Sequence, residues 1–220
     1  MMLNFDSELK TRFPDLTAIT LQINDVKIQK RDDKLEKIKV DVLKQVRDKY
    51  DLNALKDQPT FRIYRDFFWR IGIDPTKIRP AAEALIRRIL TGKTIPRINT
   101  LVDSYNLASI RSKIPLATFD SDELEGPLLM TFAKEGELFY GIGMEKPLIL
   151  KGGEIVVSDK EKLIAVYPYR DAENTKVIEK TKNVTIIICG VPGVSKGTLS
   201  DASRVVLKYV TGFCGGENQI

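Results

Sequence analysis

The residues with the clearest capacity for chemistry lie in the segment RINTLVDSYN, residues 97–106. Asn99, Asp103 and Asn106 occur at spacings of four and three, so a helix would carry all three on one face. Asn and Asp are poor helix formers because their short side chains compete for backbone hydrogen bonds. On the wall of a cleft they would supply donors and acceptors, and an aspartate would suit an ammonium group.

Two interpretations of this polar face are open. In the structural one, Asn99 is the N-cap of the helix and the other side chains tie the helix to neighbouring loops. In the functional one, Asn99, Asp103 and Asn106 are catalytic candidates in a cleft, and Ser109 extends the same wall about one turn further on.

Histidine is absent from the 220 residues, which removes the usual general base and the usual metal ligand. Hydrolases built on a Ser–His or Cys–His pair are therefore excluded. No cluster has zinc spacing. The segment GVPGVSKGT is not a phosphate-binding loop, because Lys196 precedes Gly197 instead of following a glycine. We expect neither a metal nor a cofactor.

Basic residues gather in residues 79–97, where only Glu83 opposes them, although the net charge of the chain is a mild +5. The candidates for contact with RNA phosphates are Arg79, Arg87, Arg88, Lys93 and Arg97. Arg87 and Arg88 would point about 100° apart on a helix. One of them could therefore form an internal ion pair with Asp103 or Glu83. Solvated surface charge is the alternative for the whole group.

Hydrophobic periodicity predicts the elements that must hold these groups. Apolar residues alternate within residues 15–30, which indicates a strand, and recur every three or four positions in 32–50, which indicates a helix. Further helices are expected over residues 60–70, 80–91, 99–111 and from about 198. Short apolar segments from residue 115 onward indicate strands. This order of elements predicts an α+β fold.

Three segments keep alternative interpretations. The aromatic rings of TFRIYRDFFWR, residues 60–70, either pack into a core or stack on bases beside the arginines. The carboxylates of FDSDELEG, Asp120 and Asp122, suit turn and cap chemistry better than acid–base catalysis. Cys189 lies in an apolar run and is expected to be buried, and its pairing with Cys214 is left open.

No apolar run approaches the roughly 18–20 residues that span a bilayer. The N-terminal residues MMLNFDSELK lack the basic and apolar blocks of a signal peptide. A cytoplasmic protein without a membrane partner is therefore expected.

The segments RPAAEALIRRIL, IPRINTLVDSYNLASI and IPLATFDSDEL together closely resemble the B3/B4 editing domain of the phenylalanyl-tRNA synthetase beta subunit. They look most like free-standing relatives of that domain. GGEIVVSD, YRDAENTKVIEKTKNVTIIICG and the closing helix with its FCGG tail support the resemblance. It implies a three-layer α+β fold with mixed or antiparallel sheets, flanking helices and a central cleft. It also divides the chain into an N-terminal strand–helix extension, residues 1–55, and a B3/B4-type domain, residues 56–220.

The resemblance implies that the cleft receives the 3′ end of a tRNA carrying the wrong amino acid and hydrolyses the ester. An aminoacyl ester is already activated, so a positioned water and oxyanion donors can suffice without histidine. The alternative is a non-catalytic module, accessory to a synthetase, that binds RNA or an amino-acid-like ligand. A purely structural or partner-binding protein is a third, weaker option.

The chain departs from the editing domain at two places. Ala117 stands at the position of a histidine in the family's P-x-His-Ala-Phe-Asp segment, and isoleucines in TKNVTIIICG replace a glutamate that reads a tyrosine hydroxyl. The amino-acid pocket is therefore expected to suit another side chain. Its candidates are Ser109, Asp120, Glu154 and Asp171. The carboxylates of the last three would favour a cationic amino acid. Arg170 is a further candidate for tRNA contact at the cleft rim.

Overall fold

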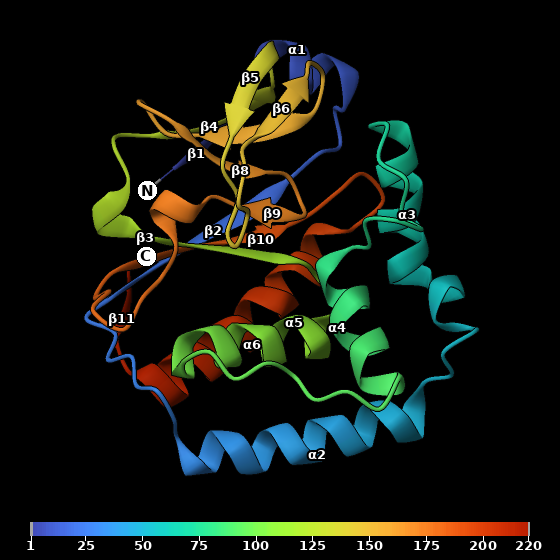
Figure 1. The fold of residues 1–220 in the computed structure, drawn as a ribbon, viewed down its shortest axis with the longest axis vertical. Coiled ribbons are helices and arrows are strands. Elements are labelled where there is room, and N and C mark those ends of the chain that lie inside the picture. The colour runs from blue at the N-terminus through green and yellow to red at the C-terminus, as the bar shows by residue number, and fades with distance from the viewer. Residues whose placement is uncertain (1, 220) are drawn as a thin grey trace.

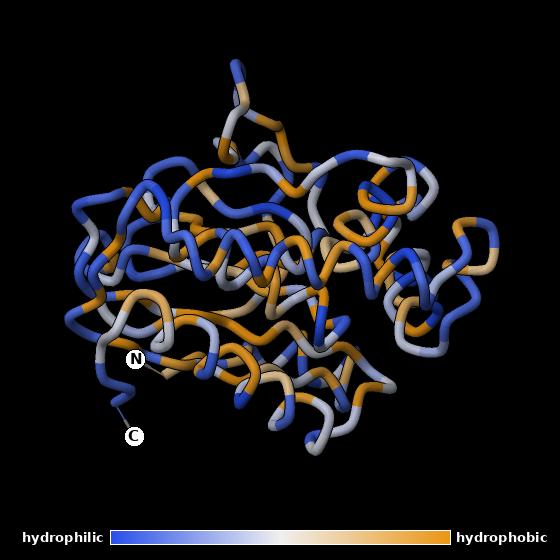
Figure 2. Tube along the Cα trace, turned by 90° about the horizontal axis from the view of Figure 1, so that it is seen from below, coloured by the Kyte–Doolittle hydropathy of each residue, from blue (hydrophilic) through white to orange (hydrophobic). Residues whose placement is uncertain are grey.

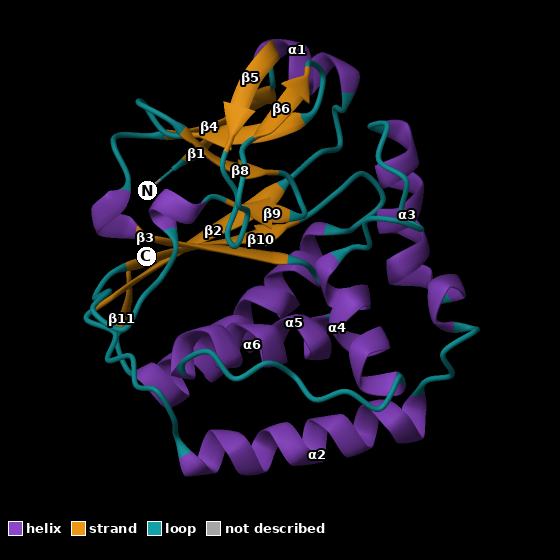
Figure 3. Ribbon diagram, in the orientation of Figure 1, coloured by secondary structure: helices purple, strands orange, loops and turns teal. Residues whose placement is uncertain are grey.

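The apolar segments of the second half of the chain form two sheets, and each sheet is completed by a strand from the N-terminal segment. The computed structural model describes residues 2–219 (Figure 1). The two sheets are stacked above a layer of helices, and the expected α+β class is confirmed. Figure 3 shows α2 (Asp33–Lys49), α4 (Ala81–Leu90), α5 (Thr100–Ser112) and α6 (Lys196–Cys214) below the strands, with α1 (Ser7–Arg12) and α3 (Pro59–Arg70) beside the strands.

The first sheet has five strands in the order β1-β4-β7-β8-β9. These strands are β1 (Leu3–Phe5), β4 (Leu128–Phe132), β7 (Ile155–Ser158), β8 (Leu163–Val166) and β9 (Arg170–Asp171). The β1 strand pairs parallel with β4, and the other pairs are antiparallel. The first three residues of β7 are all buried, so both faces of the sheet are covered there.

The second sheet has four antiparallel strands in the order β11-β2-β10-β3. These strands are β2 (Ala18–Asn24), β3 (Leu116–Asp120), β10 (Val184–Cys189) and β11 (Glu217–Gln219). Every residue of β10 is buried, which explains its continuous apolar sequence VTIIIC. The strand expected in residues 15–30 is confirmed, with narrower bounds.

Helices cover the second sheet. The layer consists of α4 (Ala81–Leu90), α5 (Thr100–Ser112) and α6 (Lys196–Cys214), and α2 (Asp33–Lys49) lies across its outer side (Figure 1). Figure 2 shows hydrophobic and hydrophilic residues alternating along these helices, as expected when one face of each is buried. In α2 the buried residues include Leu35, Val42 and Val46, which confirms the predicted stripe.

The helix α3 (Pro59–Arg70) stands beside the two sheets (Figure 1). Four of its aromatic side chains, Phe61, Tyr64, Phe67 and Phe68, are buried, so the core interpretation is confirmed for them. Trp69 differs, because 57% of its surface is exposed.

The remaining elements are short. They are α1 (Ser7–Arg12), the two-stranded sheet of β5 (Glu135–Phe139) and β6 (Leu148–Lys151), and the 3-10 turns Leu55–Asp57, Ser121–Glu123 and Glu173–Thr175. Gly152 and Gly153 follow β6 with φ of 84° and 87°, the left-handed backbone conformation that glycine adopts readily in a tight turn. Cys189 and Cys214 are both buried free thiols. Within residues 2–219, no helix is both long and apolar enough to cross a membrane.

Candidate functional site

Most side chains on the polar face of α5 form hydrogen bonds within the protein. The Asn99 side chain caps the helix by accepting a hydrogen bond from the Val102 backbone N–H at 2.9 Å. The Ser109 hydroxyl donates to the Ile114 carbonyl at 2.7 Å, and both side chains are buried. Asn106 is half-buried and makes no hydrogen bond through its side chain to any residue from 2 to 219. Asn106 alone of these three is therefore open to a ligand.

Asp103 lies in a buried ion pair that fastens α2 to α5. Its carboxylate contacts the ammonium group of Lys39 and also accepts a hydrogen bond from the Ile98 N–H at 3.1 Å. Lys39 reaches Glu36 at 2.9 Å, and Glu36 reaches Arg97 at 3.2 Å. Because the Asp103 carboxylate is already paired with Lys39, we assign Asp103 a structural role.

Several of the basic residues at 79–97 form hydrogen bonds or ion pairs within the protein. Arg87 donates to the Leu52 carbonyl at 3.3 Å and lies 3.9 Å from the fully buried Glu83, which is the internal ion pair anticipated for one of the two adjacent arginines. Arg88 donates to the Thr94 carbonyl at 2.7 Å. Arg79 and Lys93 are exposed and form no ion pair with the residues that the structure describes.

Two further candidates have partners of their own. Asp120 is buried and accepts hydrogen bonds from the Asp122 N–H at 3.1 Å and the Thr181 hydroxyl at 2.5 Å. This is the turn chemistry that the FDSDELEG segment favours. Arg170 is exposed, but its guanidinium donates to the Ile142 carbonyl at 3.1 Å.

A carboxyl group with a raised pKa, that of Asp171, lies where the two sheets meet. The edge strand β9 contacts the edge strand β3, and the Asp171 carboxylate accepts a hydrogen bond from the Thr118 N–H at 3.2 Å. The Thr118 hydroxyl is buried and has no hydrogen-bond partner. The negative charge of Asp171 also raises the pKa of the Tyr105 hydroxyl on α5. We call Tyr105, Thr118 and Asp171 the sheet-junction cluster.

Burial governs protonation in the sheet-junction cluster. Loss of hydration raises the pKa of Asp171 to about 7, against the opposing effects of the Thr118 N–H and Arg170. Burial, together with the negative charges of Asp171 and Asp103, raises the pKa of the Tyr105 hydroxyl. Near neutral pH the cluster therefore holds a carboxyl group that can take up or release a proton, beside a phenol that stays protonated.

A pocket of about 720 Å³ lies between the end of α3 and the turn that follows β6. Its lining includes Arg12, Trp69, Arg70, Lys77, Glu154 and Tyr169, and we call it the α3 pocket. Glu154 accepts a hydrogen bond from the Lys151 N–H at 2.9 Å through Oε1, while Oε2 is buried without a partner. A buried oxygen of this kind is costly unless a donor reaches it. The wall of the α3 pocket therefore contains an unsatisfied acceptor.

Tyr169 lines the α3 pocket and is close in sequence to Asp171 of the sheet-junction cluster. Its ring packs against Phe68, with centroids 6.4 Å apart, and it lies two residues before Asp171. Burial raises the pKa of its hydroxyl, and the charge of Glu154 adds to this effect. The two polar sites thus share one short segment.

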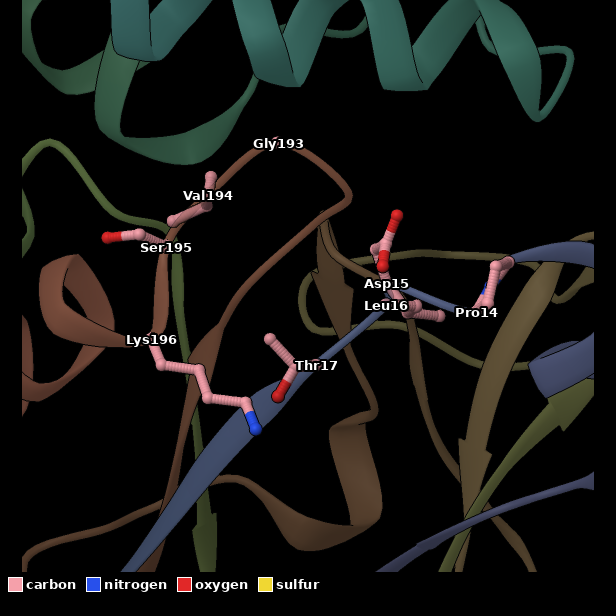
Figure 4. Close-up of a pocket in the computed structure, with 8 residues that line it drawn as sticks. All are labelled: Pro14, Asp15, Leu16, Thr17, Gly193, Val194, Ser195 and Lys196. Carbon is pink, nitrogen blue, oxygen red and sulfur yellow. The ribbon is translucent and has the colours of Figure 1, made fainter.

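A second hollow, of about 630 Å³, lies at the start of α6 (Figure 4). It is lined by residues 14–17 and 193–196, and the Lys196 side chain extends beside Thr17. The Ser195 hydroxyl accepts a hydrogen bond from the Thr198 N–H at 3.0 Å and so caps the helix. Among residues 2–219, no buried side chain lacking a partner lines this hollow. It is therefore a weaker candidate than the α3 pocket.

Sequence analysis named Asp171, Glu154 and Asn106 but missed most of their surroundings. Tyr105 and Thr118 have no local sequence signal that marks them as site residues. Trp69 had a usable signal, since a tryptophan at the end of an amphipathic helix, between Phe68 and Arg70, falls off the apolar stripe.

The chain is similar to known proteins in sequence and in fold. A family model described as the B3/4 domain matches residues 63–210. The phenylalanine–tRNA ligase beta subunit of Fusobacterium nucleatum is 32% identical over 115 residues, which are 52% of this chain and 14% of that subunit. The same subunit from Protochlamydia amoebophila is 35% identical over 91 residues, 40% of this chain and 11% of that subunit. The chain thus corresponds to about one seventh of these relatives or less.

A solved structure is similar in fold. It is an N-terminal fragment of the phenylalanyl-tRNA synthetase beta subunit from Pyrococcus horikoshii, with a TM-score of 0.53 and 15% sequence identity. The alignment covers 99% of this chain and 50% of the fragment. At this identity the likeness concerns the fold.

Proposed function

The chain belongs to the B3/4 domain family, and from this membership we propose that it is a trans-acting deacylase that hydrolyses the ester of misacylated tRNA. The observation that carries the proposal is the sheet-junction cluster. Its Asp171 carboxyl accepts one hydrogen bond, from the Thr118 N–H, and its charge raises the pKa of the Tyr105 phenol. A carboxyl group and a protonated phenol are the two kinds of group that ester hydrolysis needs.

In the proposed reaction, the Asp171 carboxylate takes a proton from water as the water oxygen attacks the ester carbonyl. The Tyr105 hydroxyl donates a hydrogen bond to the developing oxyanion. The carbon–oxygen bond to the ribose then breaks, and the ribose oxygen receives the proton held by Asp171. The products are the free amino acid and the uncharged tRNA. Asp171 thereby supplies the base that Ala117 cannot supply at the family's histidine position.

The experiment is release of labelled amino acid from a panel of aminoacyl-tRNAs that includes tyrosine, arginine, lysine and non-protein analogues. We expect release above the no-enzyme blank for one ester, increasing as pH rises through about 7 because the base must be deprotonated. Asp171→Asn should lower release by about 100-fold or more, the usual scale of general-base catalysis. Asp201→Asn, on the exposed face of α6, is the matched control.

Asp103→Ala would be a poor probe of catalysis, because it would remove the more buried of the two carboxylates that pair with the buried Lys39 and so would disturb the fold. A folded protein that releases no amino acid from any ester of the panel contradicts the deacylase proposal. The second candidate, a non-catalytic RNA-binding module, would then lead. It is favoured by the structural partners of Asn99, Asp103 and Ser109, which leave few free groups on α5.

A further inference from the structure

Trp69 is an exception to the pattern of its helix. The other aromatic residues of α3 are at most 1% exposed, whereas Trp69 is 57% exposed and lines the α3 pocket. A large apolar ring left in water forgoes the free energy of burial. Packing within the chain therefore does not account for the position of this ring, while a flat partner stacked on it would.

The charges around Trp69 are predominantly positive. Arg12, Arg70, Lys77 and Lys151 line the same pocket, and none of them forms an ion pair with a described residue. Asp74 and Glu154 are the acidic residues of the lining, and Asp74 is already hydrogen-bonded to Thr76 at 2.6 Å. Four free cations against two carboxylates favour an anionic ligand.

Two of these cations are held in place by aromatic rings. The guanidinium of Arg12 lies 5.6 Å from the centroid of Phe13 and 5.2 Å from that of Phe132. The guanidinium of Arg70 lies 5.1 Å from the centroid of Phe13. Cation–π contacts fix both groups without neutralising them. Their donors therefore remain available at a defined position beside Trp69.

An exposed aromatic ring among unpaired arginines and lysines is the arrangement that binds single-stranded nucleic acid, with bases on the ring and phosphates on the cations. We propose that the α3 pocket binds an unpaired RNA strand, with a base stacked on Trp69 and phosphates contacted by Arg12, Arg70 and Lys77. This proposal rests on the proposed function and names the surface that holds the 3′ strand of the tRNA. The unpartnered Oε2 of Glu154 is buried in the pocket wall, so it would accept a hydrogen bond from an amino group of that strand or of its amino acid once the carboxylate turns toward the pocket.

Trp69 is the only tryptophan of the chain, so its fluorescence reports directly on this pocket. The probe is the uncharged tetranucleotide 5′-ACCA-3′. We expect quenching on titration, with affinity falling about 15- to 20-fold between 50 and 200 mM salt, because its three phosphates each contribute about −0.7 to the logarithmic slope.

Variants separate the two kinds of contact. Trp69→Ala, measured by anisotropy of labelled RNA, should weaken binding by about 5- to 150-fold at every salt concentration. Arg70→Ala should reduce the salt slope by about 0.7. Lys208→Ala, an exposed lysine on α6, is the matched control and should change neither quantity.

Absence of quenching and of anisotropy change at 50 mM salt would overturn the proposal. Equal competition by a polyglutamate peptide would also overturn it, because that result indicates an acidic protein partner. The RNA is uncharged, so the outcome is independent of hydrolysis. Amino-acid release without tetranucleotide binding would refute this surface alone, and binding without release would refute the deacylase alone.

Discussion

Replacing Asp171 by asparagine should stabilise the folded protein at neutral pH while it removes the proposed base. The amide of asparagine retains an oxygen that can accept the hydrogen bond from the Thr118 N–H, now 3.2 Å from the carboxylate. It carries no charge, so it avoids the cost of burying a carboxylate. The side chain that weakens the fold is thus the one that the proposed chemistry needs.

The magnitude follows from the pKa of Asp171, which burial raises from 3.8 to about 7. At 1.36 kcal/mol for each pKa unit, a shift of about three units corresponds to an upper bound of about 4 kcal/mol. The side chain is only half-buried, so residual hydration reduces the expected gain to about 2 kcal/mol. That gain would raise the Tm by about 4–8 °C in a chain of this length.

The sign depends on pH. Below about pH 4 the carboxyl group is protonated in both the folded and the unfolded state, and the two proteins should be equally stable. From pH 4 to 7 the unfolded state loses its proton first, so the wild type loses stability and the advantage of Asp171→Asn grows. Above pH 7 the difference should stay constant.

Urea unfolding at pH 4.5, 6 and 8 measures this difference, with Asp201→Asn as an exposed control. A stability difference that is the same at all three pH values would refute the burial of a titrating carboxyl. A variant that is less stable than the wild type at pH 8 would show that the charged form is stabilised by the fold.

Two further predictions concern residues outside the sheet-junction cluster. Lys39→Ala should lower the free energy of unfolding by about 3–5 kcal/mol, because it leaves the Asp103 carboxylate buried without its partner. Urea unfolding checks this loss, and a change below about 1 kcal/mol would show that the pair is not buried. Glu154→Gln should weaken binding of aminoacylated RNA more than binding of uncharged RNA, if the free Oε2 contacts the α-ammonium group. Parallel anisotropy titrations test it, and equal weakening of both would assign that oxygen to the RNA strand instead.

Local patterns were enough to predict the elements. The alternation in β2, the three-and-four spacing of α2 and the glycines after β6 each depend on residues that are close in sequence. The same reasoning correctly offered Asn99 as a helix cap, since capping is a local hydrogen bond.

Sequence alone determined the α+β class, the absence of a histidine-based mechanism and the pool of polar residues available for a site. It could not determine which of those residues are free. Lys39 engages Asp103 across 64 positions, and Thr118 reaches Asp171 across 53. Only the tertiary structure decides such partners, because burial and hydrogen bonding depend on segments that meet after folding. For that reason Asp103 has a structural role, while Trp69 stays exposed and Oε2 of Glu154 has no hydrogen-bond partner.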